Sequence, residues 1–166
     1  MYAPSTSSHA LWQWAQGNAP ALVGALVYQQ RSGINTRNAL MHGELPQEHH
    51  VSENGIKFKV DLLSRQNTGI FPDMRRGREF VQANSKNAKV LNLFSYTCGF
   101  SVAAMQGGAD QVINMDMNKG VLRTGKQNHQ LNGFDQGVSY FPHDILKSFG
   151  KLKQSAPYEL IIVDPP

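Results

Sequence analysis

The pattern of apolar and polar positions changes near residue 77 of this chain. Residues 56–60 alternate apolar and polar side chains, which predicts a half-buried antiparallel strand. Residues 21–30 are rich in Val, Leu and Ala and predict another strand, whereas 43–50 is polar and contains a proline, as loops do. Residues 69–71 are expected to begin the return strand. The first 77 residues are therefore expected to form a small α+β appendage.

From residue 78 to residue 166, short apolar runs alternate with segments of helical pattern. The expected order is a helix over 78–83, a strand over 89–94, a helix over 99–106, a strand over 111–115, a helix over 119–131, a strand over 137–141, a helix over 145–154 and a strand over 158–163. Such alternation predicts an α/β fold with a parallel sheet and right-handed crossovers.

Two of these strands end in features suited to a ligand of the adenosine type. A tight turn over 95–99 follows the first strand, and Asp116 ends the second, about 20 residues further on. A carboxylate at that position can accept bonds from two ribose hydroxyls. The turn contains only Gly99 and lacks the three glycines that cradle a pyrophosphate, so it suits a ligand without phosphate, such as S-adenosylmethionine. An ordinary strand–helix–strand crossover with an acidic strand end is the alternative.

The end of the chain adds a second carboxylate to the same region. The apolar run 160–163 leads directly into Asp164, Pro165 and Pro166, and proline stops a strand because it has no N–H to donate. In open α/β sheets the ligand lies outside the carboxyl ends of the strands. Asp164 is therefore expected beside the same crevice as Asp116 and the 95–99 turn.

Together these segments resemble motifs of class I S-adenosylmethionine-dependent methyltransferases. The matching segments are NLFSYTCGFSVAA at 92–104, Asp116, PHD at 142–144 and VDPP at 163–166. The block ENGIKFKVDLLSRQNTGIFPDMRRGREFV at 53–81 narrows the resemblance to bacterial large-subunit rRNA methyltransferases of the cytosine carbon-5 type. The resemblance implies a truncated Rossmann-like sheet in the order 3-2-1-4, holding strands 1–4 of the family's seven. The chain is thus expected to be an inactive fragment that ends within the fourth motif.

The resemblance also implies a role for each matching residue around S-adenosylmethionine. Asp116 would bind the ribose and Met117 would lie on the adenine face, while Asp144 would bond the adenine amino group and Ile145 would pack on its ring. The methionine part would face a set of turn residues: Ser95, Tyr96, Thr97 and Gly99. A segment over the cofactor would contribute Thr68, Asp73 and Arg75. Asp164 would lie nearest the methyl group and the target base, as the catalytic residue.

Several of these residues have simpler alternative roles. Asp144 is a good helix N-cap, and Met117 could be a core methionine. Arg75, Arg76 and Arg78 form a dense basic cluster that could bind RNA phosphates or form a solvated helix face. We do not assign Cys98 as a nucleophile, because it occupies a small-residue position of the cofactor turn.

Composition adds an expectation about partners and location. The net charge of +4 and pI near 9.3 suit a polyanionic partner, and the resemblance implies that this partner is RNA, specifically ribosomal RNA. One cysteine and six scattered histidines, treated as surface or loop residues, give no metal-ligand spacing, so no metal is expected. No apolar run is long enough for a membrane span, and no signal segment is evident, so a cytoplasmic enzyme is expected. A silent RNA-binding module, or a methyltransferase for small molecules or proteins, remains an alternative.

Overall fold

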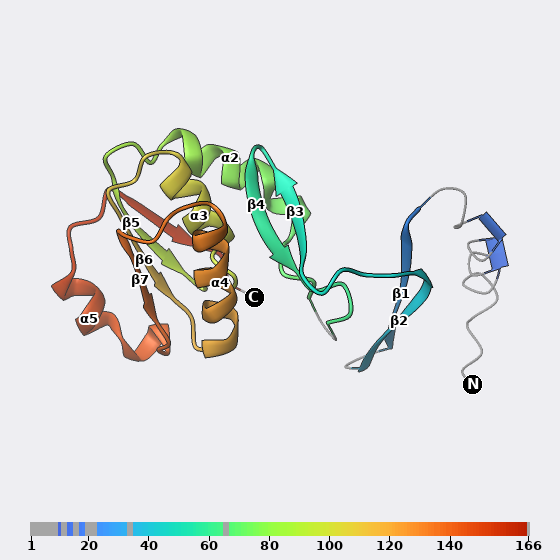
Figure 1. Cartoon of the computed structure of the whole chain (residues 1–166). Helices are drawn as coiled ribbons and strands as arrows, with labels where there is room; N and C mark the ends of the chain where they lie inside the picture. The colour runs from blue at the N-terminus through green and yellow to red at the C-terminus, as the bar shows by residue number, and fades with distance from the viewer. Residues whose placement is uncertain are drawn as a thin grey trace. The chain divides into compact units, whose positions relative to one another are not determined.

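The computed structural model describes residues 10, 13–14, 17–18, 23–32, 35–64 and 67–165 of the chain. These residues divide into two compact units that interleave along the sequence (Figure 1). The first unit comprises residues 1–49 and 60–68, and the second comprises residues 50–59 and 69–166.

The first unit contains one antiparallel hairpin. Strand β1 (Ala25–Ser32) pairs with β2 (Asn35–Gly43), with an irregularity in register between Leu26 and Val27. In the second stretch of this unit, residues 60–68, the backbone N–H of Asp61 donates a hydrogen bond to Thr68 O at 2.8 Å. Strand β1 confirms the strand expected within 21–30, shifted toward the carboxyl end.

The second unit is built around a four-stranded parallel sheet in the order β7-β6-β5-β8. Its strands are β5 (Lys89–Leu93), β6 (Gln111–Met115), β7 (Val138–Phe141) and β8 (Leu160–Val163). In sequence order this is 3-2-1-4, so the expected topology is confirmed, as is the α/β fold class. All four strands end at the same edge of the sheet. The register shows this, because Leu93 pairs with both Met115 and Val163, and Met115 pairs with Phe141.

Helices cover both faces of this sheet (Figure 1). On one face, α2 (Arg75–Ala83) and α3 (Gly99–Gln106) contribute Val81 and Ala104 to a core with Val90 and Val112. Helix α4 (Lys119–Leu131) lies on this side as well. On the other face, Leu152 of α5 (Phe149–Gln154) packs with Leu91, Ile113 and Met115.

Two of the four expected helices have the predicted bounds, and two differ from the prediction. Helices α3 and α4 have the expected bounds, and Gly133 takes φ +78° just beyond α4, as the left-handed stop requires. The helix expected over 145–154 is instead a 3-10 turn, η2 (Ile145–Lys147), followed by α5. Helix α2 begins three residues earlier than expected, directly after the 3-10 turn η1 (Pro72–Met74).

A second hairpin packs on the helical face. Strand β3 (His49–Glu53) pairs with β4 (Ile56–Val60), and Ile56 and Phe58 join Val102 and Ala103 of α3 in a third cluster. The strand over 56–60 is thus confirmed, but the return strand expected at 69–71 is wrong. Its partner is β3, which alternates half-buried and exposed residues, and whose first two residues, 49 and 50, fall within the 43–50 segment predicted as a loop.

Candidate cofactor site

The turn between β5 and α3 has an unusual backbone. Phe94, Tyr96 and Cys98 adopt left-handed φ angles of +55°, +46° and +61°. Such angles are uncommon for residues other than glycine, and they recur where a backbone is shaped around a ligand. The turn is closed by a bond from Cys98 N to Ser95 O at 2.7 Å, and Ser95 N reaches Met115 O of β6 at 3.1 Å.

Asp116 ties this turn to the end of β6. Its Oδ2 accepts from Tyr96 N at 2.9 Å, and its Oδ1 accepts from Asn118 N, also at 2.9 Å. Its own N–H donates to Phe141 O of β7 at 3.2 Å. An ionised carboxylate has about four acceptor sites, so each oxygen can accept a further bond. Asp116 is half-buried, and is therefore neither a freely solvated carboxylate nor a fully occupied one.

The other residues of the turn also fit a polar ligand. Ser95 Oγ is buried and has no hydrogen-bond partner among the described residues, and such an orphan hydroxyl is rare. Thr97 is buried, and its Oγ1 donates to Gly69 O at 2.6 Å. The rings of Tyr96 and Phe71 lie 5.3 Å apart, so the 69–71 segment lies against the turn. These features fit S-adenosylmethionine, which carries hydroxyl and ammonium donors.

Asp144 and its neighbours stand at the same edge of the sheet, after β7. Asp144 Oδ1 accepts from Leu146 N at 3.0 Å, so the side chain caps η2, as the alternative role required. Its Oδ2 lies 3.5 Å from Lys147 Nζ. Ile145 is buried in the cluster of the α5 face, while Met117 is 68% exposed and is not a core methionine.

The remaining predicted residues lie in different surroundings. Asp164 directly follows β8, at the edge of the sheet where all four strands end, and is exposed. Asp73 is exposed within η1, and Thr68 belongs to the first unit. The structure therefore brings the 95–99 turn, Asp116, Asp144 and Asp164 to one edge of the sheet. Thr68 is not among the residues at this edge.

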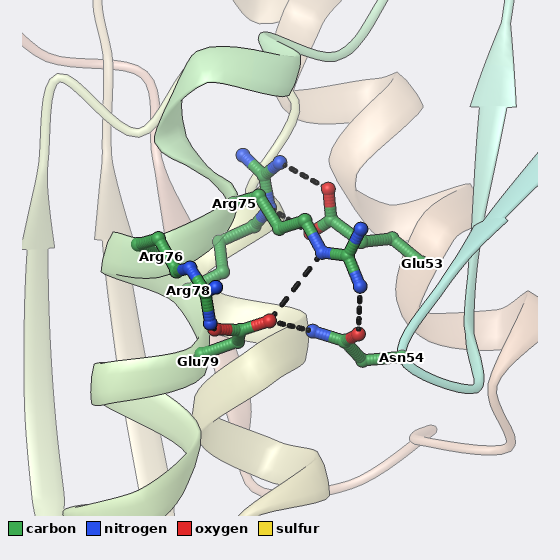
Figure 2. A network of polar contacts seen from close by, with 6 residues as sticks. All are labelled: Glu53, Asn54, Arg75, Arg76, Arg78 and Glu79. Atoms are coloured by element: carbon green, nitrogen blue, oxygen red, sulfur yellow. Dashed lines mark hydrogen bonds and ion pairs between the residues drawn. The ribbon is translucent and has the colours of Figure 1, made fainter.

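Figure 2 shows that the arginines of α2 are paired with the β3–β4 hairpin and with Glu79. Arg75 Nη2 donates to Asn54 Oδ1 at 2.9 Å, and Arg75 Nε lies 3.4 Å from Glu79 Oε1. Hydrogen bonds from Arg76 and then Asn54 hold the pKa of the Glu79 carboxyl below its usual value. Arg75 thus reaches the hairpin turn, whereas the sequence predicted that it faces the cofactor.

Arg78 differs from its two neighbours in being buried. Its side chain forms two 2.7 Å bonds to the two carboxylate oxygens of Glu53. The interpretation of 75–78 as one basic cluster for RNA phosphates is therefore wrong for Arg78, because a buried, paired guanidinium cannot reach a phosphate on the surface.

Cys98 is a residue of the turn whose side chain is fully buried, and burial raises the pKa of its thiol above the ordinary range. A buried thiol with a raised pKa is a poor nucleophile. This agrees with the decision to leave Cys98 outside the catalytic set.

A buried chain of polar side chains, which could not be predicted from the sequence pattern, joins β5, β6, α3 and α4. Asn92 of β5 donates to Asn114 of β6 at 3.0 Å, and Asn114 donates to Ser101 Oγ of α3 at 3.0 Å. Ser101 Oγ lies 2.8 Å from His129 Nε2, and His129 Nδ1 lies 2.8 Å from Gly125 O. A carbonyl only accepts, so the His129 proton is on Nδ1, and Nε2 accepts from Ser101.

The position of His129 corrects its assignment as a surface or loop histidine. It is buried, and burial lowers its pKa. Its signal was helical spacing: Leu122, Gly125 and His129 repeat at three and four residues and form the buried face of α4. Asn128 belongs to the same face and holds the turn, since its Nδ2 donates to Thr97 O at 2.9 Å.

Among the described residues, no group of three or more His, Cys, Asp or Glu side chains is arranged to hold a metal ion. Within the same part of the chain, no helix has both the length and the apolar character needed to cross a membrane.

The sheet order, the shaped turn after its first strand and the acidic end of its second define a class I Rossmann-like fold of the methyltransferase type. A family model described as S-adenosylmethionine-dependent methyltransferase matches residues 7–166, and the chain belongs to this family. The cofactor of the family is S-adenosylmethionine.

Relatives of known name agree with this assignment. A ribosomal RNA large subunit methyltransferase I from Aeromonas salmonicida is 36% identical over 141 residues, covering 83% of this chain and 36% of that protein. The protein of the same name from Vibrio cholerae is 36% identical over 143 residues, with the same coverage. The chain thus spans little more than a third of the length of these relatives.

Solved structures match the fold. A putative SAM-dependent methyltransferase from Streptococcus mutans has a TM-score of 0.73 and 34% identity, covering 78% of this chain and 35% of that one. A SAM-dependent methyltransferase from Agrobacterium tumefaciens has a TM-score of 0.77, covering 90% of this chain and 49% of that one. Its identity of 24% supports the fold alone.

Proposed function

We propose that this chain binds S-adenosylmethionine at the 95–99 turn and serves methyl transfer to RNA. The single observation that carries the proposal is the carboxylate of Asp116, which holds the turn through Tyr96 N at 2.9 Å and keeps acceptor capacity on both oxygens. A ribose with two neighbouring hydroxyls is the ligand that uses this capacity.

The proposed role of each residue follows from the hydrogen-bonding capacity or the exposed surface that its side chain retains. Ser95 Oγ, which lacks a partner among the described residues, would bond the methionine part together with turn N–H groups near Gly99. Asp144 uses Oδ1 to cap η2 and keeps acceptor capacity for an adenine amino group. Met117, largely exposed, would cover the adenine face. When bound, the cofactor supplies a methyl group on a sulfonium, ready for in-line displacement.

The contribution of the protein to such a reaction is mainly positioning. Methyl transfer from a sulfonium needs little acid–base chemistry, and alignment of the reactants can supply about 7–11 kcal/mol of the barrier. Asp164, exposed at the end of β8, would face the target base beside the methyl group. The other proposed contacts within the second unit are Tyr96, Thr97, Ile145, Asp73 and Arg75, of which Arg75 would have to leave Asn54 to reach a ligand.

The finer proposal is that the substrate is large-subunit ribosomal RNA, methylated at carbon 5 of cytosine. The relatives named above carry the words ribosomal RNA large subunit in their names, and the net charge of +4 suits a polyanion. The DPP sequence at 164–166 supports a ring-carbon target, because enzymes that methylate amino groups use an NPPY form. An rRNA substrate would place the protein in the cytoplasm.

Since the chain spans only 36% of the length of its relatives, the test is a methylation assay of the full-length gene product. The assay uses the labelled cofactor and three substrates: naked 23S rRNA, a protein mixture and a metabolite extract. The proposal predicts label in rRNA, recovered as 5-methylcytidine after digestion to nucleosides. Label in protein or metabolites would contradict the RNA proposal. Binding of cofactor and RNA without transfer would identify a silent binding module.

A further inference from the structure

We propose that Arg78 is a positioning residue of the cofactor site, which fixes the 69–71 segment and the start of α3 from beneath. The proposal rests on the proposed cofactor site. It assigns to Arg78 a role different from those of Arg75 and Arg76, the arginines beside it on α2.

Arg78 is held in a buried, paired state. Its Nε and Nη2 donate to the two oxygens of Glu53 at 2.7 Å each, and the residue is 4% exposed. The guanidinium also lies 5.8 Å from the centre of the Phe58 ring. A buried charge is tolerated only when it is paired and hydrogen-bonded, so Glu53 on β3 and Arg78 on α2 depend on each other. Figure 2 shows the two groups face to face.

The third nitrogen of the guanidinium reaches the segment in front of the turn. Arg78 Nη1 donates to Phe71 O at 3.0 Å. The ring of Phe71 lies 5.3 Å from that of Tyr96, and Gly69 O accepts from Thr97 Oγ1 at 2.6 Å. The 69–71 segment is therefore held at one end by the turn itself and at the other by Arg78.

The stem of Arg78 also lies beside the start of α3. A Cβ added at Gly99 would lie 3.6 Å from Arg78 Cδ, which is an ordinary van der Waals distance, so the stem occupies the space next to this glycine. One side chain thus bonds the hairpin and the covering segment and lies next to the first residue of the helix after the turn. Only arginine can do this, because three separate acceptors are bonded by one rigid fork of donors, whereas lysine carries a single point charge.

The neighbouring arginines lack this arrangement. The side chain of Arg76 is 90% exposed and that of Arg75 is 57% exposed, and both pair with Glu79 on their own helix. Exposed pairs of this kind contribute little. The structure therefore separates Arg78 from the two residues next to it, although all three look alike in the sequence.

The experiment compares Arg78→Lys and Glu53→Gln with two controls, Arg76→Lys and Val81→Ala. Val81 is buried on the same helix in the core of the sheet, so its truncation destabilises the fold without touching the segment. Each variant is measured for S-adenosylhomocysteine affinity by calorimetry, for thermal unfolding, and for hydrogen exchange of the backbone amides of 69–71 and 95–99.

We expect Arg78→Lys to weaken affinity about tenfold or more and to speed exchange in both segments. Glu53→Gln should act in the same direction, and it preserves the shape of the side chain if Arg78→Lys does not fold. Val81→Ala should lower the unfolding temperature with unchanged affinity, and Arg76→Lys should change neither.

Wild-type affinity and exchange in both Arg78→Lys and Glu53→Gln would overturn the proposal, as would an equal loss of affinity in Val81→Ala. If the wild-type protein does not bind S-adenosylhomocysteine, the proposed function fails. The exchange of 69–71 then decides on Arg78 by itself, with unchanged exchange in both variants counting against it.

Discussion

The backbone N–H of Tyr96 donates to Oδ2 of Asp116 at 2.9 Å, joining the turn after β5 to the acidic end of β6. The two residues are neighbours because Leu93 and Met115 pair at the ends of adjacent parallel strands. The carboxylate that is proposed to bind the ribose therefore also shapes the loop that is proposed to bind the methionine part. Both halves of the site are positioned by one side chain before any ligand arrives.

The close approach of α4 to the turn gives the first prediction. A Cβ at Gly125 would lie 2.9 Å from Cys98 Cβ and 3.3 Å from Thr97 C, so Gly125→Ala must push α4 and the turn apart. Overpacking of a core typically costs about 1–3 kcal/mol of unfolding free energy, which a denaturant titration can measure.

The matched control is Gly150→Ala. Gly150 lies in α5 with no atom within 4 Å of an added Cβ, and alanine is the better helix former, so this variant should be neutral or slightly stabilising. Equal unfolding free energies for the two variants would show that the contact between α4 and the turn is not tight.

The sheet could be predicted from the sequence because its signals are local. Runs such as 111–115 are apolar and bounded by turn residues, and the bounds of α3 and α4 follow from Gly107 and Asn132. Chain order then fixes the topology, since crossovers are right-handed. The placement of Asp116 and the turn at one edge follows from the same logic.

What could not be predicted depends on pairing between distant residues. The partner of β4 is chosen by the burial of Ile56 and Phe58 on α3, and the polar sequence of β3 does not reveal it. The Glu53–Arg78 pair joins residues 25 apart, and nothing local separates Arg78 from Arg76. Helical spacing could have placed His129 on the buried face of α4, but its polar partners on other elements, Ser101 on α3 and Tyr140 on β7, could not be predicted locally.

The buried imidazole of His129 predicts how stability depends on pH. Burial lowers the pKa of His129 in the folded protein, so below a pH of about 6.5 the unfolded chain binds a proton that the folded protein does not. Stability is therefore lost as the pH falls through the unfolded value toward the folded one, by at most about 1.4 kcal/mol per pH unit for one group.

Chemical unfolding at pH 7.5, 6.5 and 5.5 measures this dependence in wild type and in His129→Gln. The variant removes the titrating group and should have the shallower slope, whatever its stability at pH 7.5. Gln130→Ala, an exposed position of the same helix with no titrating group, should keep the wild-type slope. Parallel slopes for wild type and His129→Gln would mean that the imidazole titrates alike in the folded and unfolded states.

Cys98 is the only cysteine of the chain, so its reactivity can be followed without interference. Because the thiol is buried and burial raises its pKa, alkylation by iodoacetamide at pH 8 should be far slower in the native protein than in denaturant. Mass spectrometry over time gives both rates. Similar rates would place the thiol at the surface and reopen the question of its role.

Asp116 is the residue on which the proposed cofactor site depends most, and calorimetry with S-adenosylhomocysteine tests its role directly. Asp116→Asn keeps one oxygen acceptor but loses the second and the charge, and the loss should cost about 2–3 kcal/mol. The dissociation constant should then rise about 30–150-fold. Asp110→Asn is the control, since Asp110 is exposed at the opposite end of the same strand and should bind as wild type does. An unchanged affinity in Asp116→Asn would contradict the ribose role and with it the proposed site.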